Sequence, residues 1–597
     1  MNILALTPPG RFPTVVSDPG QWWDRVSFSK DHKQVRFSAN AAWWQIICSA
    51  SAPDALLAGL SWSQSLRLRT QWRAAGLDIR RTCALADKSL DALRDPDTYR
   101  SICAYKQAIE LLDEHLRALN KAQRSIRFSF EAGPLAAGVD YNDSSSMLAY
   151  ARKDTLLSRL ILSALDHCHD KIDLLIVSAT SAQDLLCAMI CVRLLREKNP
   201  LMHACLGDHG YENFSLQPHL AALRGTGALS RVFDTIIESK DERDDVIVSL
   251  IRSLSANNDI KGFLRSAQFP KIEKPFQYGP PAPPVPAFTP YPVFWTRLSK
   301  RRCYWSKCAF CAQNNKYDDP RPASLQEVSH AISRLERLYK AGYRNFYFSD
   351  EAVSPAWLDL FCQELEKKTL KFKWACRSKV ETSFTPELLT RLRASGCYEL
   401  LFGLETISAR MQQRMNKYVA GLDARCIREM FFAAGRAGVG THVNLLAGFP
   451  GDTPSEARET VDFVIETLKR VENSTFILNK FVLFPDTPVL RTPEKYDITP
   501  LPSKGDMPSH YGFEPAPEIK EDMLAVDRLI PSLRKRLYCE LGWNDLITGS
   551  VQDTLLSFYF NTGHGAIFKA MDCNPFADPS KTAYISATLE GDRFPCL

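Results

Sequence analysis

The sequence predicts an α/β protein with three parts: a Rossmann-like domain with a helical insertion, a partial (β/α)6 barrel, and a mainly helical C-terminal extension. Three observations lead to this prediction. A strand, a helix and a second strand follow one another between residues 171 and 206. Nine prolines then interrupt residues 270–292. Beyond them, short apolar runs alternate regularly with amphipathic stretches, as in parallel α/β folds.

Length and composition limit the classes of protein to consider. A chain of 597 residues exceeds one ordinary core, so two or three domains are expected. With 74 basic and 68 acidic residues, the net charge of +6 indicates neither a nucleic-acid groove nor a surface for anionic membranes. The first six residues lack a cationic leader, and the most apolar segment, residues 174–195, contains charged side chains, so neither export nor a membrane span is expected. Seventeen cysteines then indicate reduced thiols and a cytoplasmic location.

The N-terminal part, residues 1–269, begins with a short apolar run at residues 1–6. Stronger strand patterns occur at residues 171–178 and 201–206, with a helix at 183–197 between them. This arrangement is a parallel Rossmann-like unit, whose ligands bind at the carboxyl ends of the strands.

The segment between the first two strands, residues 22–167, is expected to be mainly helical. Its clearest stretch repeats apolar residues at the helical period from Ile102 to Leu119. The prolines of residues 270–292 cannot hold a helix or a central strand, so they are expected to form an extended linker at the main domain boundary.

Residues 293–498 predict six strands with five intervening helices, which indicates a partial parallel barrel. In such barrels the reactive groups lie on the loops that follow the strands. Residues 499–597 form an accessory region with a helix at 521–530 that Pro531 is expected to stop, followed by an apolar stretch at 551–560. The expected strands are 293–298, 345–349, 372–376, 398–402, 441–447 and 475–483; the expected helices are 324–340, 356–367, 386–394, 424–437 and 455–470.

Cys303, Cys308 and Cys311 lie within nine residues, and no further cysteine or histidine follows until His330. A structural zinc site is closed by four ligands, whereas a four-iron cluster held by three thiolates keeps one iron open for a substrate or cofactor. The trio is therefore the candidate metal centre. A zinc knuckle that borrows His330 or Cys376 is the alternative.

Three further motifs accompany the cysteines: Phe-Ser-Asp-Glu-Ala-Val-Ser-Pro at 348–355, Leu-Phe-Gly-Leu-Glu-Thr-Ile-Ser at 401–408 with Met-Asn-Lys at 415–417, and Leu-Ala-Gly-Phe-Pro-Gly-Asp-Thr-Pro at 446–454. With them, the segment from about Pro292 to Ile498 resembles radical S-adenosylmethionine (radical SAM) enzymes. In particular it is similar to the branch that carries an N-terminal cobalamin-binding domain, whose core the unit at 171–206 resembles.

The resemblance implies a role for each residue of the candidate site. The three cysteines would ligate a [4Fe-4S] cluster, and the open iron would be chelated by the amino and carboxylate groups of S-adenosylmethionine. Phe310 would lie near the adenine, although it reads equally as a core residue, and Arg377 would pair with the carboxylate or form a structural salt bridge. The remaining implied contacts are Asp350 and Glu351 with the methionyl ammonium, Glu405 with the ribose, and Gly448 as a close backbone approach or a simple turn glycine.

Two features depart from the family pattern. Four residues separate Cys303 from Cys308 where the family has three, and a loop can absorb the extra residue because the cluster fixes only the sulfur positions. For cobalamin, the chain has only Asp208-His209-Gly210 in place of the Asp-x-His-x-x-Gly motif of other cobalamin domains, and it follows the wrong strand. The radical branch commonly lacks that histidine as well, so cobalamin stays the expected cofactor.

Cobalamin contacts are predicted from position alone. Thr7, Pro8, Ser178, Thr180 and Gly207 lie at expected strand ends, where a corrin and its nucleotide tail would bind. Ordinary turn residues occupy such positions equally.

In this branch, cleavage of S-adenosylmethionine gives a 5′-deoxyadenosyl radical, and the resemblance implies C-methylation of an unactivated carbon in a peptide or natural product. No catalytic side chain of the chain itself is singled out. A reductase such as flavodoxin or ferredoxin would supply electrons, and a peptide or small molecule would be the substrate. The alternatives are a radical SAM epimerase, cyclase or rearrangement enzyme without methyl transfer, and a non-catalytic iron–sulfur or cobalamin-binding protein.

Overall fold

The computed structural model divides the chain into two compact units. The first comprises residues 1–292 with 504–508, and the second comprises residues 293–503 with 509–597. The predicted linker at 270–292 and the apolar stretch at 551–560 fall mainly or wholly outside the described residues. The structure describes residues 1–9, 15–17, 23, 32–49, 52–57, 61–74, 78–100, 102–129, 133–166, 168, 171–207, 220, 227–237, 243–256, 261–264, 289–299, 303–312, 324–471, 474–503 and 505–541.

The first unit contains a parallel sheet with the strand order β3-β1-β6-β7-β8-β9. Its inner strands are short apolar runs with almost no exposed surface, as expected for strands covered on both faces. The predicted strands at 1–6, 171–178 and 201–206 are confirmed. The strands of this unit are β1 (Asn2–Thr7), β2 (Val15–Ser17), β3 (Lys33–Ser38), β6 (Leu174–Ser178), β7 (His203–Gly207), β8 (Thr235–Ile237) and β9 (Gly262–Leu264), with the hairpin β4 (Ile126–Arg127) and β5 (Leu135–Ala136).

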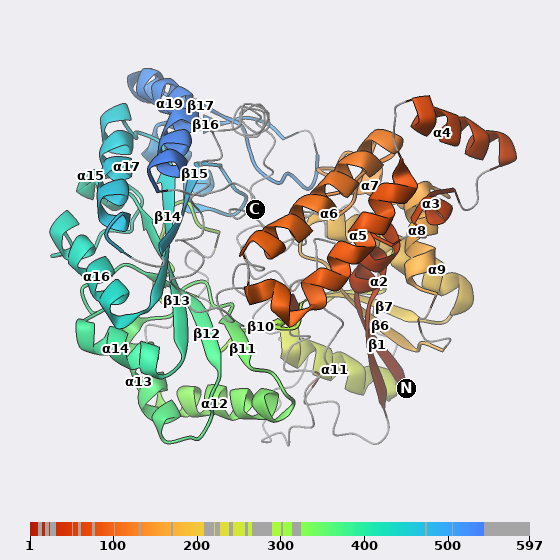
Figure 1. Ribbon diagram of the computed structural model, residues 1–597, viewed down its shortest axis with the longest axis horizontal. Coiled ribbons are helices and arrows are strands. Elements are labelled where there is room, and N and C mark those ends of the chain that lie inside the picture. Colours follow the sequence, from red (N-terminus) through yellow and green to blue (C-terminus); the bar gives the residue numbers. More distant parts are fainter. Residues whose placement is uncertain are drawn as a thin grey trace. The chain divides into compact units, whose positions relative to one another are not determined.

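Helices pack on this sheet. The helix α11 (Arg243–Ser255) places Val246, Ile247 and Leu250 against Ile3 and Ile176 in one hydrophobic cluster. A capping box at Ser181 starts α9 (Ala182–Lys198), which contacts β6 (Figure 1). The other helices are α2 (Ala39–Ile47), α3 (Ala52–Leu57), α4 (Trp62–Ala74), α5 (Ile79–Arg94), α6 (Ile102–Ala122), α7 (Ser144–Ala151) and α8 (Leu156–Ala164).

One strand of this sheet lies inside the segment predicted to be mainly helical. The strand β3 pairs in parallel with β1 along its whole length, from Asn2 opposite Lys33 to Thr7 opposite Ser38. Its sequence, Lys-Gln-Val-Arg-Phe-Ser, lacks a continuous apolar run, and each of its side chains keeps some exposure. Because β3 is an edge strand of the sheet, it carries polar residues. It therefore lacks the apolar pattern from which a strand is predicted.

The second unit holds the expected partial (β/α)6 barrel, an open parallel sheet whose six strands pair in the order β15-β14-β13-β12-β11-β10 (Figure 1). Each strand follows its predecessor through a helix, so all their carboxyl ends meet at one edge. The strands are β10 (Val293–Thr296), β11 (Asn345–Phe348), β12 (Lys373–Lys379), β13 (Cys397–Glu405), β14 (Gly440–Ala447) and β15 (Ser474–Lys480); the helices are α12 (Leu325–Lys340), α13 (Pro355–Glu366), α14 (Pro386–Ala394), α16 (Ala424–Ala437) and α17 (Pro454–Leu468).

The two faces of this sheet differ in chemistry. Phe348 stacks on Trp374 and packs edge-on against Phe361 of α13, while Phe402 packs against Phe431 of α16, so one face is covered by helices. Side chains alternate along a strand, so the opposite face carries Arg377, Lys379, Glu399, Glu405 and His442. This inner face is polar, as expected of a ligand-binding site and not of a packed core.

The described part of the accessory region corrects one prediction. The helix α19 (Pro517–Leu541) runs through Pro531 instead of ending there, and packs along α17. Buried Val526, Ile530 and Leu537 hold both halves of the helix in place, and this packing offsets the lost backbone hydrogen bond. The short helix α15 (Ala409–Arg414) follows β13 inside the barrel segment. The short helix α18 (Pro488–Arg491) and the hairpin β16 (Ile498–Pro500) and β17 (Phe513–Pro515) lie between β15 and α19 along the chain.

No helix among the described residues is long and apolar enough to cross a membrane.

Candidate functional site

The three cysteines lie on the loop after β10, at the carboxyl edge of the barrel sheet. The backbone of Cys303 forms an isolated parallel β-bridge with that of Ala352. The Ser306 N–H donates to the Cys303 Sγ at 3.3 Å. Ser306 adopts a left-handed φ of 46°, and the Trp305 Nε1 donates to the Asn416 carbonyl at 2.9 Å. The four residues between Cys303 and Cys308 thus include a tight turn at Ser306, and the hydrogen bond to Asn416 holds the Trp305 indole.

The environment of these thiols fits an anionic metal cluster. Burial, and after it the neighbouring Cys308, raises the pKa of Cys303 to about 12. Burial also raises the pKa of Cys308, whereas Lys417 and Lys379 favour its thiolate. Such thiols lose their protons when iron binds, and nearby ammonium groups stabilise the resulting charge.

The zinc alternative finds no support in the described part of the chain. A single zinc ion would draw three or four ligands to within about 2.3 Å of itself, and no group of three or more His, Cys, Asp or Glu side chains there is arranged around one ion. His330 is exposed on α12, and Cys376 is buried near Asp350 and Cys362. Thiolates around a four-iron cube stand further apart than those around one ion.

Asp350 is fully buried, and its carboxylate is occupied by backbone. One oxygen accepts the Leu298 N–H and the other accepts the Ser299 N–H, both at 2.9 Å. The Ser299 hydroxyl donates to the same group. Asp350 therefore holds the chain between β10 and the cysteines, a role different from the contact with a methionyl ammonium that the sequence indicated.

Glu351 and Arg377 form an ion pair on the inner side of the barrel. Their side chains are 13% and 21% exposed, and the Nη1 to Oε2 distance is 3.4 Å. The Arg377 guanidinium also lies 5.6 Å from the centre of the Tyr347 ring. Arg377 lies within β12 and not at its end, so the predicted carboxylate contact would require it to reach up past Lys379.

Glu405 ends β13 in a strained conformation, with a φ of +63° that side chains other than glycine rarely adopt. Its carboxylate accepts from the Lys417 Nζ at 2.7 Å, and both side chains are about nine-tenths buried. A Cβ on Gly403 would lie 2.6 Å from this Nζ and 2.8 Å from the Glu405 Oε1. Glycine at 403 thus gives the ion pair its space, beside a register shift in the β13–β14 pairing.

Lys379 is the residue that sequence reasoning missed. It ends β12, is 4% exposed, and lies with its Nζ 4.1 Å from the centre of the Trp305 ring. Its position two residues after Arg377, on the same face of the strand, was the available signal. Lys417 was quoted within a motif but received no role.

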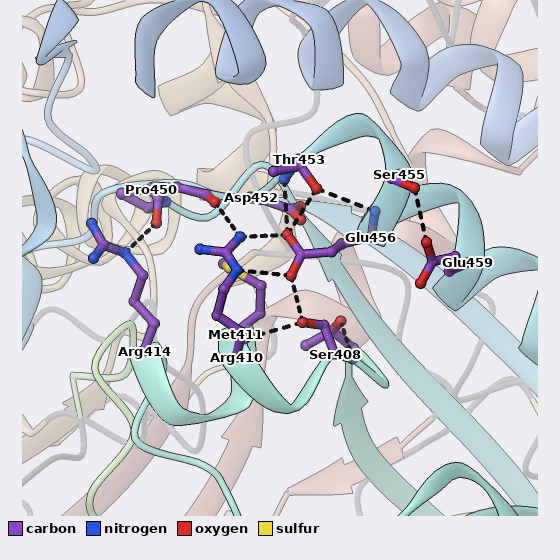
Figure 2. Close-up of polar contacts among 12 residues, drawn as sticks. Ser408, Arg410, Met411, Arg414, Pro450, Asp452, Thr453, Ser455, Glu456 and Glu459 are labelled. Carbon is purple, nitrogen blue, oxygen red and sulfur yellow. Dashed lines mark hydrogen bonds and ion pairs between the residues drawn. The ribbon is translucent and has the colours of Figure 1, made fainter. Parts of the chain in front are cut away.

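Gly448 follows β14 with a φ of +77°, and its N–H donates to the Asp452 Oδ2 at 2.9 Å. Burial raises the pKa of Asp452 to about 6. Two arginines of α15 hold this loop from outside: the Arg410 Nη2 donates to the Gly451 carbonyl and the Arg414 Nε donates to the Pro450 carbonyl, each at 2.7 Å (Figure 2).

The same loop is fastened through Glu456, in the first turn of α17. Glu456 accepts from Ser408 at 2.6 Å, from Thr453 at 2.8 Å and from Arg410, and it completes the capping box of α17 (Figure 2). The loop that would approach the cofactor is therefore rigid before any ligand binds.

Phe310 packs on the core under this loop. Its ring lies 6.4 Å from Phe449 in an edge-on arrangement and 5.7 Å from the Lys417 Nζ. Both readings made from the sequence, an adenine neighbour and a core residue, are compatible with this position.

In the first unit, the predicted cobalamin residues do gather at one sheet edge. Ser178 and Gly207 are register partners at the ends of β6 and β7, Thr7 ends β1, and buried Pro8 follows it. Thr180 is instead engaged by its own helix, because its hydroxyl donates to the Asp184 Oδ2 at 2.6 Å. His209 lies outside the described residues.

Part of the barrel is similar to a known protein family. Residues 300–464 match the family model of the radical SAM superfamily. A relative named uncharacterized methyltransferase PH0819, from Pyrococcus horikoshii, is 23% identical in an alignment of length 235 that covers 36% of this chain and 49% of the relative. The matched part thus spans about half of that protein's length.

Solved structures of similar fold include two enzymes. The cobalamin-dependent S-adenosylmethionine radical enzyme OxsB with aqua-cobalamin bound is 13% identical, with 76% of this chain and 73% of OxsB covered at a TM-score of 0.43. The radical S-adenosylmethionine methyltransferase TsrM from Kitasatospora setae, with tryptophan substrate and a SAM analogue bound, is 12% identical, with 74% and 91% covered at a TM-score of 0.46.

Proposed function

Because residues 300–464 form a radical SAM domain, we propose that this chain is a cobalamin-dependent radical SAM enzyme that C-methylates an unactivated carbon of a peptide or natural product. When bound to Cys303, Cys308 and Cys311, a [4Fe-4S] cluster would supply the electron that cleaves S-adenosylmethionine. The observation that carries the proposal is the cysteine loop itself, three partly buried thiols after β10, of which Cys308 has its thiolate favoured by Lys417 and Lys379.

Three residues of the barrel, Glu351, Arg377 and Gly448, then receive a task in binding. Glu351 lies at the sheet edge next to the cysteine loop and would accept from the methionyl ammonium, while Arg377 would meet the carboxylate. Gly448 would let the backbone approach the cofactor, since a side chain there would be strained at its positive φ. Hydrogen bonds from Arg410 and Arg414 would hold the loop around Gly448 in position for this approach.

Cobalamin is proposed for the carboxyl edge of the first sheet, near Thr7, Ser178 and Gly207. A ligand crevice at that edge is the general rule for open parallel sheets. Methyl transfer is further supported by the methyltransferase name of the relative that matches part of the chain. Asp184 accepts both the hydroxyl and the backbone N–H of Thr180, so a contact of Thr180 with cobalamin would use its carbonyl oxygen.

The test uses the full chain, reconstituted anaerobically with iron, sulfide and cobalamin, then supplied with S-adenosylmethionine, a reductant and candidate peptides or metabolites. We expect a product heavier by one methylene and an equal amount of 5′-deoxyadenosine. A product of unchanged mass with 5′-deoxyadenosine released would reject methylation in favour of epimerisation, cyclisation or rearrangement. Cobalamin retained through anaerobic purification separates these reactions from the proposed one.

A further inference from the structure

Lys379 is a buried ammonium without a carboxylate partner: among the described residues no ion pair includes it. Its side chain is 4% exposed and its closest charge-stabilising contact is the Trp305 ring, at 4.1 Å from Nζ to the ring centre. Burial lowers the pKa of Lys379 to about 8, with the neighbouring Lys417 as the next cause. A buried cation costs free energy unless an anion or an aromatic ring compensates it.

The groups near Lys379 whose negative charge would stabilise it are one carboxylate and the cysteine thiolates that form when iron binds. Cys308 and Cys303 both favour its charged form, as does Glu381, whose carboxylate accepts from the Tyr304 hydroxyl. The influence is mutual, because Lys379 favours the Cys308 thiolate.

Lys417 differs from Lys379 in this respect. It also favours the Cys308 thiolate, but its charge is paired with Glu405 at 2.7 Å, and Glu405 acts on Cys308 in the opposite sense. The positive charge left over for the sulfurs is therefore that of Lys379.

We propose that Lys379 is a positioning residue that compensates the negative charge of a cluster bound by Cys303, Cys308 and Cys311, and so raises its reduction potential. This inference rests on the proposed function only in requiring that the cluster binds. A [4Fe-4S]2+ core with three thiolates carries one net negative charge. It carries two after accepting one electron from an external reductant, and no bond forms or breaks. A fixed cation nearby stabilises the reduced state more than the oxidised one.

The contact between Trp305 and Lys379 supports this proposal. Trp305 belongs to the cysteine loop with the unusual spacing, and its ring is anchored by the hydrogen bond to Asn416. A ring can hold an ammonium without neutralising it, whereas a carboxylate would cancel the charge. The cysteine loop thus supplies a partner that leaves the charge of Lys379 available to the cluster.

The test is a redox titration of the reconstituted full chain with dithionite, followed by electron paramagnetic resonance and carried out without S-adenosylmethionine. The variants are Lys379→Met and Lys379→Arg. The matched control is Lys373→Met, at the other end of the same strand, where Nζ lies 4.8 Å from the Tyr398 ring. We expect Lys379→Met to lower the ratio of reduced to oxidised cluster about tenfold at a fixed potential, which for one electron equals about 59 mV.

The reduction potentials of Lys379→Arg and Lys373→Met should stay close to that of the wild type. An unchanged potential in Lys379→Met would overturn the proposal, as would an equal shift in the methionine and arginine variants, since both exclude the charge as the cause. An unchanged potential with weakened binding of S-adenosylmethionine would assign Lys379 to that ligand instead.

Iron content per chain covers the case in which Lys379→Met holds no cluster. Loss of iron from Lys379→Met, with iron kept in Lys379→Arg and Lys373→Met, supports charge compensation. Loss from both variants at 379 contradicts it. Because no S-adenosylmethionine is present, a failure of this inference leaves cleavage and methylation untouched, and their failure leaves the titration valid.

Discussion

At the scale of single residues, the site separates side chains that build the loops from those that are open to a ligand. Two adjacent acids show this most clearly. Asp350 is fully buried with both oxygens on backbone N–H groups, whereas Glu351 faces Arg377 on the inner side of the barrel. The motif at 348–355 contains both carboxylates, but only the folded chain shows that their contacts differ.

This distinction predicts opposite effects of two conservative substitutions. Asp350→Asn replaces an oxygen acceptor by a donor facing a backbone N–H, so we expect the free energy of unfolding to fall by about 2 kcal/mol. Glu351→Gln should leave that free energy nearly unchanged and raise the Kd for S-adenosylmethionine. Chemical denaturation and equilibrium binding measure the two quantities. Equal destabilisation by both substitutions would contradict the assignment.

The cysteine trio gives a second prediction at this scale. Cys308→Ala should lose most of the iron of the reconstituted chain, because a cluster with two protein thiolates is poorly held. Cys426→Ala, which removes another partly exposed thiol on α16, should keep the iron of the wild type. Iron and sulfide assays decide this, and equal iron in both variants would remove the trio from the metal centre.

At the scale of elements, one glutamate links the loop from Gly448 to Thr453 with both α15 and α17. Glu456 caps α17 and binds Ser408 and Arg410, whereas Glu459, one turn further, accepts only from Ser455, at 2.8 Å, among the contacts drawn in Figure 2. We expect Glu456→Ala to lower the free energy of unfolding by about 1–3 kcal/mol, as the loss of a cap and of charged hydrogen bonds would. Glu459→Ala is the control and should change it by less than about 0.5 kcal/mol. Similar unfolding curves for the two variants would show that the loop is held otherwise.

The same loop predicts a pH dependence. Burial raises the pKa of Asp452 from 3.8 to about 6. A carboxyl group with a raised folded-state pKa disfavours folding once ionised, so this penalty is absent below about pH 4 and complete above about pH 6. The rise corresponds to about 3 kcal/mol at most. Asp452→Asn keeps a carbonyl acceptor for Gly448 but does not titrate, so its stability relative to the wild type should increase from pH 4 to pH 6. A difference independent of pH would contradict the burial of this charge.

At the scale of the whole molecule, the sequence predicted the architecture well where elements are buried and regular. The strand at 441–447 is found at Gly440–Ala447, and the helix at 386–394 begins and ends where expected, because apolar periodicity and caps specify both. The edge strand β3 was not predicted because its exposure leaves it without an apolar pattern. The helix α19 continues past Pro531 because tertiary packing outweighs the local cost of proline.

The site was predictable as a set of motifs but not as a set of contacts. The cysteines, Glu405 and Gly448 could be found because their spacing is distinctive. For Lys379 the sequence offers only its place two residues after Arg377, and its relation to Trp305 and Cys308 requires the folded chain. Roles that depend on which oxygen meets which N–H, as for Asp350, require the folded chain.

The most direct test of the account measures cleavage of S-adenosylmethionine by the anaerobically reconstituted, dithionite-reduced full chain. We expect methionine and 5′-deoxyadenosine to appear in equal amounts, and Cys308→Ala to release neither. Wild-type protein that carries its full complement of iron and sulfide yet leaves S-adenosylmethionine intact would contradict the central claim, that three thiolates hold a cluster with one iron open to this cofactor.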